Sequence, residues 1–165
     1  MRITPLLFLC LTLTHCTARK EKPVETTDSI KPTGIPEMLE RNGKHIDFER
    51  LKGKILIVNL WATWCMPCVK EMPDLFALTK ILPQGQFELL LATDQSVKTI
   101  NKFASKQGLD LHYVQLKNNI ESLGVYALPT TLIYDRSGNE IHRLLGDRFW
   151  TSEETILFFN NMLPE

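Results

Sequence analysis

Two almost wholly apolar runs limit what this chain can fold into more than any other feature of its sequence. Residues Ile55–Leu60 and 87–92 are rich in aliphatic side chains, a pattern typical of central strands that are covered on both faces. Between them, residues 67–82 carry apolar side chains at helical spacings. The order strand, helix, strand predicts two parallel strands joined by a helical crossover.

The second half of the chain predicts two further helices. Residues Val97–Gln107 have a helical pattern that ends at Gly108, and glycine often closes helices. Thr151 and Glu154 match a capping box, which predicts a terminal helix over residues 151–163. Three aromatic residues are expected to pack this helix against the domain: Trp150, Phe158 and Phe159.

Turn-forming residues predict two antiparallel hairpins. Residues Thr130–Tyr134 and Glu140–Leu145 flank a polar turn at 135–139. The dipeptide Asn42-Gly43 is a strong hairpin signal, with 38–41 and 45–48 as the arms. The element order is then β-α-β-α-β, followed by β-β-α. We therefore expect an α/β fold with a central mixed β-sheet, helices on both faces and an N-terminal β-hairpin extension.

Length and charge favour a single domain and argue against nucleic acid as a partner. The 165 residues leave room for one ordinary domain and a leader. Lysine and arginine total 19, acidic residues also total 19, and no basic block is present, so no net field would attract a polyanion. We predict a signal peptide at 1–16, a flexible linker at 17–35 and a folded domain at 36–165.

The first residues have the pattern of a secretory leader. Arg2 gives a positive start, and the apolar run after it is too short to span a membrane. A buried amphipathic helix is the alternative. Residues 13–16 resemble a bacterial lipoprotein signal in which Cys16 carries lipid, but His15 replaces the usual small residue, so cleavage after Ala18 is a second possibility. Both cleavages imply export, and if Cys16 carries lipid the polar, solvated linker is a tether.

The reactive chemistry of the chain is concentrated in the motif Cys65-Met66-Pro67-Cys68, which follows the strand Ile55–Leu60 and opens the next helix. Unpaired N–H groups at a helix start stabilise an anion, so Cys65 is expected to be a reactive thiolate of lowered pKa. Cys68 lies almost one turn further on, close enough for the two sulfurs to form a disulfide. Pro67 fits the first turn, where a missing N–H has no cost.

Two alternatives to redox chemistry exist for this pair. A structural disulfide would close so small a loop that it would restrict the unfolded chain little. A zinc site needs four ligands, but the other two cysteines lie in the leader and the remaining histidines are scattered: His45, His112 and His142. We therefore expect a redox-active pair, with no metal and no organic cofactor.

Four blocks of sequence resemble one branch of the thioredoxin fold. They are Gly53-Lys54, residues 59–68 (NLWATWCMPC), Glu71-Met72-Pro73, and residues 124–131 (GVYALPTT). Residues 34–165 are similar to the exported TlpA/ResA/DsbE-like thiol-disulfide oxidoreductases. The resemblance implies a thioredoxin-like fold and dithiol-disulfide exchange by Cys65 and Cys68.

The resemblance also implies how the second cysteine loses its proton. Asn59 stands where cytosolic thioredoxins have a buried aspartate that moves protons for this cysteine, so the carboxylate of Glu71 would do that work. An i, i+3 relation places Glu71 on the same side of the helix as Cys68. The alternative is that Glu71 only complements the helix dipole. Pro73 implies a kinked helix.

A substrate-binding surface is implied as well. Leu128-Pro129 is similar to the family's cis-proline loop, which faces the cysteines and offers backbone groups to an extended substrate. Of Trp61 and Trp64, we expect one in the core and the other in an apolar surface around Cys65, although both could be core residues. Substrate binding is therefore assigned to Trp64, Met66, Pro67, Leu128 and Pro129.

We expect a monomeric enzyme outside the cytoplasm, in which Cys65 attacks a substrate disulfide and Cys68 resolves the mixed disulfide. By resemblance the direction is reductive, with electrons from a membrane thiol reductase and with a secreted protein or an apocytochrome c as the substrate. One alternative is a thiol peroxidase, although the Cys-x-x-Cys spacing argues against it. Another is a non-catalytic module that binds peptides in the cis-proline groove.

Overall fold

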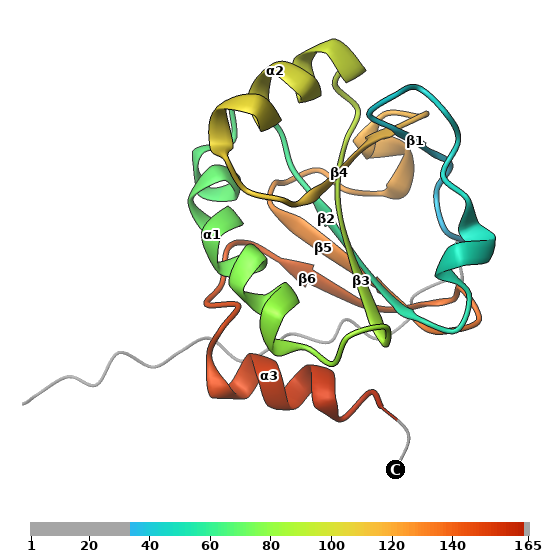
Figure 1. Cartoon of the computed structure of the whole chain (residues 1–165), viewed down its shortest axis with the longest axis vertical. Helices are drawn as coiled ribbons and strands as arrows, with labels where there is room; N and C mark the ends of the chain where they lie inside the picture. Colours follow the sequence, from blue (N-terminus) through green and yellow to red (C-terminus); the bar gives the residue numbers. More distant parts are fainter. Residues whose placement is uncertain (1–33, 164–165) are drawn as a thin grey trace, which may run out of the picture.

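A six-stranded mixed sheet forms the centre of the computed structural model, which describes residues 34–163 (Figure 1). The strand order is β1-β4-β3-β2-β5-β6. β2 pairs in parallel with β3 and antiparallel with β5, and β3 pairs in parallel with β4. The predicted mixed sheet is therefore confirmed. The strands are β1 Met38–Glu40, β2 Ile55–Leu60, β3 Phe87–Thr93, β4 His112–Leu116, β5 Thr130–Tyr134 and β6 Glu140–Leu145.

Within these residues the chain also forms three α-helices and two short 3-10 helices. They are α1 Met66–Ile81, α2 Val97–Gln107, α3 Glu153–Asn160, η1 Phe48–Leu51 and η2 Ile120–Leu123. α2 ends at Gly108 as predicted, and the φ of 65° at this residue is a left-handed conformation that glycine adopts without strain. Pro73 lies inside α1, which continues through it.

The terminal helix differs from its prediction at both ends. The predicted cap at Thr151 is wrong, because the Ser152 hydroxyl accepts the N–H of Thr155 and caps α3. α3 ends at Asn160, and the chain then turns through residues 161–163. The turn is closed by backbone bonds from Met162 and Leu163.

The N-terminal hairpin forms only in part. Its turn is present, because the N–H of Gly43 donates to the carbonyl of Glu40 at 2.8 Å. The returning arm makes a single bridge, between Leu39 and His45. It does not extend to residue 48, because Asp47 caps η1 and turns the backbone into a 3-10 helix. β1 is instead held mainly by β4.

The two faces of the sheet carry separate hydrophobic clusters. One face is covered by α1, α2 and α3, which bury Met72, Leu75, Leu78, Ile100, Ala104 and Phe159. The other face is covered by residues 35–51 and by η2. Helices therefore lie on both faces as expected, although those of the second face are 3-10 turns. Full burial of a Leu or Met side chain contributes about 1.5–3 kcal/mol to folding.

The fold brings the cysteine motif and the Leu128-Pro129 loop to one edge of the sheet. Leu60 at the end of β2 pairs with Thr130 at the start of β5. The segment that leaves β2 and the segment that enters β5 therefore lie next to each other. The first of these segments leads to Cys65, and the second contains Pro129.

The signal peptide predicted at 1–16, the candidate lipidation residue Cys16 and the linker up to residue 33 lie outside the described residues. Among residues 34–163, no helix combines the length and the apolar character that crossing a bilayer requires. The predicted domain start at residue 36 falls just before β1 begins at Met38.

Candidate active site

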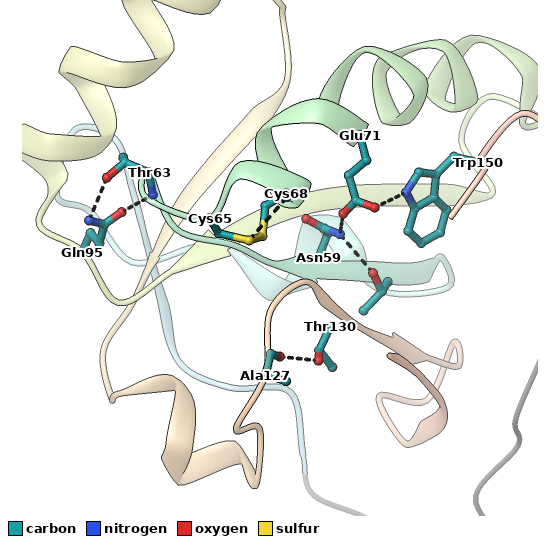
Figure 2. Close-up of a disulfide and its surroundings, with 10 residues drawn as sticks. Asn59, Thr63, Cys65, Cys68, Glu71, Gln95, Ala127, Thr130 and Trp150 are labelled. Atoms are coloured by element: carbon teal, nitrogen blue, oxygen red, sulfur yellow. Dashed lines mark hydrogen bonds between the residues drawn. A yellow bond between two sulfur atoms is a disulfide. The ribbon is translucent and has the colours of Figure 1, made fainter. Parts of the chain in front are cut away.

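A disulfide joins Cys65 and Cys68 at the start of α1 (Figure 2). Cys65 is the N-cap residue of α1, and the N–H of Cys68 donates to its sulfur at 3.3 Å. The Cα atoms are 5.3 Å apart. Cys65 is 5% exposed, whereas Cys68 is fully buried. The structure thus brings the two sulfurs together, and Cys65 is the one that a partner can reach.

The residues next to Cys65 expose large apolar side chains. Trp64 is 71% exposed, Met66 is 61% exposed, and Pro67 is also exposed. Trp61 is fully buried, so the expected division between the two tryptophans is confirmed. Tyr126 is 86% exposed and precedes the Leu128-Pro129 loop. Tyr126 is not among the predicted site residues, although an aromatic residue so close to this loop could have indicated it.

The loop before β5 is held in place from two sides. Its Leu128-Pro129 bond is cis, as the resemblance implied. The Thr130 hydroxyl donates to the carbonyl of Ala127 at 2.7 Å, across the loop (Figure 2). The Gly146 N–H, just after β6, donates to the carbonyl of Pro129 at 2.9 Å. Pro129 is buried and Leu128 is partly buried, so a partner would meet mainly the edge of this loop.

Both carboxylate oxygens of Glu71 accept hydrogen bonds from buried side chains (Figure 2). The amide nitrogen of Asn59 donates to Oε1 at 2.9 Å, and the indole nitrogen of Trp150 donates to Oε2 at 2.9 Å. Glu71 is 5% exposed, and its two partners are fully buried. The carboxylate therefore lies inside the protein, which argues against a role limited to complementing the helix dipole.

Burial raises the pKa of Glu71 above its ordinary value of 4.5, because the charged carboxylate loses its hydration. The hydrogen bonds from Trp150, Asn59 and the backbone of Arg148 oppose this increase, and the negative charge of Asp147 adds to it. A carboxyl group shifted in this direction exchanges its proton at a pH closer to that at which thiols titrate.

Gln95 fixes the segment that precedes Cys65. Its Oε1 accepts the Thr63 N–H at 2.8 Å, and its Nε2 donates to the Thr63 hydroxyl at 3.1 Å (Figure 2). Because Gln95 lies between β3 and α2, this pair ties the end of β3 to the active-site segment. The sequence analysis missed Gln95, since the contact spans 32 residues and no motif marks it.

The predicted site residues fall into two groups. The first lies around the start of α1 and the loop before β5, with three exposed members, Trp64, Met66 and Pro67, and three that are buried or partly buried, Cys65, Leu128 and Pro129. The second is the buried carboxylate of Glu71 with Asn59. Trp150 completes this group, although the sequence analysis expected it only to pack the terminal helix. In the described part of the chain, no three His, Cys, Asp or Glu side chains are grouped so that they could hold a metal ion.

Comparisons with known proteins agree with this geometry. The family model described as "AhpC/TSA family" matches residues 33–143. Thiol-disulfide oxidoreductase ResA of Bacillus thuringiensis (strain Al Hakam) is 31% identical over 125 residues, which are 74% of this chain and 71% of that protein. The protein of the same name from Bacillus thuringiensis subsp. konkukian is 30% identical over a gapped alignment of 170 positions, which covers 99% of this chain and 95% of that protein.

A solved structure shows the same fold. The thioredoxin domain of a thiol-disulfide oxidoreductase from Bacteroides vulgatus superposes with a TM-score of 0.65 at 19% identity. The match covers 82% of this chain and all of that domain (100%). The expected thioredoxin-like fold is thereby confirmed.

Proposed function

This chain belongs to the AhpC/TSA family and is a thiol-disulfide oxidoreductase, and we propose that it reduces disulfide bonds of other proteins outside the cytoplasm. The observation that carries the proposal is the Cys65–Cys68 disulfide at the start of α1, in which Cys65 keeps 5% exposure and Cys68 is fully buried. A more exposed cysteine that attacks first and a buried one that resolves the mixed disulfide suit sequential thiol exchange.

In the proposed reaction the reduced protein is the electron donor. The Cys65 thiolate, stabilised by the N–H groups of the helix start, attacks one sulfur of a substrate disulfide. The substrate S–S bond breaks, a mixed disulfide forms, and the first substrate sulfur leaves and takes up a proton. Cys68 then attacks the Cys65 sulfur, which breaks the mixed disulfide and releases the second substrate sulfur. Two electrons pass to the substrate, and Cys65–Cys68 is left oxidised.

Glu71 is proposed as the base for the second step. The thiol of Cys68 must lose its proton before it attacks, and Cys68 is fully buried, so bulk water cannot readily accept that proton. Glu71 follows Cys68 by one helical turn, its carboxylate is buried, and burial raises its pKa. These properties suit a group that accepts a proton from a thiol and later returns it to solvent.

The proposed substrate is a protein segment in an extended conformation. The exposed side chains of Trp64 and Met66 offer apolar area beside Cys65, the exposed Tyr126 precedes the loop at Leu128-Pro129, and this loop offers backbone groups. Pro67 contributes to the same surface at the start of α1. Aromatic and Met side chains are common at sites that accept many sequences, so we propose recognition of apolar segments with little sequence preference.

The compartment and the partners are proposed from the leader and from the resemblance. The leader at 1–16 would direct export, and lipid on Cys16 would hold the domain near a membrane, as a monomer on the tether at 17–35. A membrane thiol reductase would then supply the electrons. An apocytochrome c awaiting haem is the proposed substrate among exported proteins. No nucleic acid is expected as a partner, because the chain has no net charge.

Two variants of the exported fragment test the proposal with insulin as the disulfide substrate. Cys65→Ser should abolish reduction of insulin, because the remaining cysteine of the pair, Cys68, is fully buried. Cys68→Ser should still attack but should accumulate mixed disulfides, which survive in non-reducing electrophoresis. Activity retained by Cys65→Ser, or no trapped species with Cys68→Ser, would contradict the division of roles.

A further inference from the structure

We propose that Trp150 and Asn59 are positioning residues that hold one oxygen each of the Glu71 carboxylate, so that it stands ready to accept the proton of Cys68. This inference rests on the proposed role of Glu71. It adds a residue from the loop between β6 and α3, Trp150, to a site otherwise built from β2, α1 and β5.

The hydrogen-bond chemistry of the two partners supports this assignment. The indole N–H of Trp150 can only donate, and the atom of Asn59 that contacts Glu71 is the amide nitrogen, also a donor. Two donors at 2.9 Å, one on each oxygen, match the ionised carboxylate and oppose its protonated form. Because all three side chains are buried, water does not weaken these bonds.

Trp150 is fixed in place by its own packing. Its ring stacks on Phe159 of α3 with the two ring planes 25° apart, and the guanidinium of Arg148 lies 5.6 Å from its ring centre. The indole is fully buried, so its N–H cannot readily turn away from the carboxylate. Because the packing already immobilises the indole, its hydrogen bond to Glu71 costs little further side-chain conformational entropy.

Asn59 is fixed from β5 as well. Its amide nitrogen also donates to the Thr131 hydroxyl at 3.0 Å, which sets the orientation of the amide. Its Oδ1 is buried and has no hydrogen-bond partner among the described residues. In Figure 2 this oxygen is on the side of the amide toward the disulfide, while the nitrogen faces Glu71. Asn59 thus lies between the sulfurs and the carboxylate in this view.

The other charged groups around Glu71 come from the loop before α3. Asp147 repels the carboxylate, and the charge of Arg148 attracts it. β2 and β5 contribute only neutral groups to its hydrogen bonds, Asn59 and, through it, Thr131. On α1 itself Lys70 precedes Glu71 and Asp74 follows it by one turn, and Cys68 becomes ionisable once the disulfide is reduced. Removal of the Trp150 N–H therefore leaves the charges unchanged and alters only the bonding of Glu71.

Trp150→Phe is the decisive variant, because it keeps an aromatic ring and deletes the N–H. Trp61→Phe is its matched control: Trp61 is also fully buried, but its indole nitrogen has no hydrogen-bond partner among residues 34–163. The measurement is the pH profile of the resolving step. Reduced protein is mixed with dithiobisnitrobenzoate, and the second release of coloured thiolate reports the attack by Cys68.

We expect Trp150→Phe to move the rising limb of this profile to higher pH by about one unit, because a carboxylate that loses one charge-assisted hydrogen bond holds its proton more tightly. Trp61→Phe should leave the limb in place, even if it lowers stability. In a Glu71→Gln background the contribution of Glu71 to the limb is absent, and Trp150→Phe should then cause no further shift.

The outcomes separate this inference from the proposed function. One outcome is that Glu71→Gln removes the part of the rising limb of the pH profile that Glu71 causes, while Trp150→Phe leaves the limb at the same pH. In that case the positioning role of Trp150 is wrong and the role of Glu71 stands. An equal shift in Trp61→Phe would likewise reduce Trp150 to a packing residue. If Glu71→Gln leaves the profile unchanged, the proposed base itself is wrong.

Discussion

A row of charged side chains on β3, β4, β1 and the residue before β2 should make stability depend on pH in acid, and Glu88→Gln tests this. Lys54 Nζ lies 2.8 Å from Glu88 Oε2, and His112 Nδ1 lies 3.0 Å from Glu88 Oε1. His112 Nε2 lies 3.1 Å from Glu40 Oε2. Glu88 therefore lies between Lys54 and His112, which is cationic when protonated, and its replacement by Gln removes the charge that both of them bind.

The size of the effect follows from the pKa of Glu88. The hydrogen bond from His112 is the largest cause that lowers it, and the bond and charge of Lys54 add to this against desolvation, so that the pKa falls from 4.5 to about 2. A fall of about 2.5 units corresponds to roughly 3 kcal/mol of stabilisation. The Glu88 side chain is 24% exposed, and solvent screening reduces this to about 1–2 kcal/mol.

The sign follows from linkage. A carboxyl group whose folded pKa is lowered stabilises the protein fully above its unfolded pKa, here 4.5, and loses that contribution as the pH falls through about 2. Glu71 acts in the opposite direction because burial raises its pKa. The difference between Glu88→Gln and the unmodified protein is therefore the quantity to measure, since the contribution of Glu71 cancels in it.

Urea unfolding of the oxidised protein at several pH values gives this difference. We expect Glu88→Gln to lower the free energy of unfolding by about 1–2 kcal/mol at pH values above 4.5 and by much less near pH 2. Glu121→Gln, an exposed carboxylate on η2 and outside the row, serves as the control. If the two proteins differ in unfolding free energy by the same amount at both ends of the pH range, the electrostatic explanation is refuted. Altered packing would then account for the difference.

Other substitutions test separate parts of the structure. His112→Gln should destabilise most below pH 6.5 and less as the pH rises through the raised folded pKa of His112, as measured by the same urea series. Ser152→Ala should cost about 1 kcal/mol of unfolding free energy and Thr151→Ala much less, because only Ser152 caps α3. Met72→Ala should cost about 2–5 kcal/mol, since Met72 is fully buried between α1 and the sheet. Trp64→Ala should raise KM for insulin and leave the rate with a small aromatic disulfide nearly unchanged, because Trp64 is exposed beside Cys65 and only a protein substrate reaches it.

Local sequence patterns predicted those elements whose ends are set by local chemistry. β2, α2, β5 and β6 have the predicted bounds. Gly108 ends α2 through its own backbone conformation, and the turn at 135–139 is closed by Asp135, whose carboxylate accepts the N–H groups of Ser137 and Asn139. Signals of this kind act within a few residues, so a single sequence contains them.

Predictions failed where two neighbouring residues could play the same part, or where the outcome depended on a distant element. Thr151 and Ser152 both carry hydroxyls that could cap α3, and the choice is made by the turn that closes when the Ser152 N–H donates to Phe149. The N-terminal hairpin likewise has a good turn, yet β1 finds its main partner in β4, which no local pattern indicates. The cysteine pair could be located from the sequence because its motif is contiguous. The residues around Glu71 could not, because they come from distant segments of the chain.

The partner of Glu71 shows why the buried half of the site could not be predicted. A carboxylate inside the protein needs a donor for each oxygen, and β2 supplies only one, the amide nitrogen of Asn59. Oε2 faces the loop that packs on α1 before α3, so its donor had to come from there, 79 residues away in the sequence. The backbone of Arg148 in the same loop also bonds Glu71, and the packing of Trp150 on Phe159 holds the indole beside Oε2. A buried acid one turn after a Cys-x-x-Cys motif therefore implies that a second donor exists, while the fold alone decides which residue provides it.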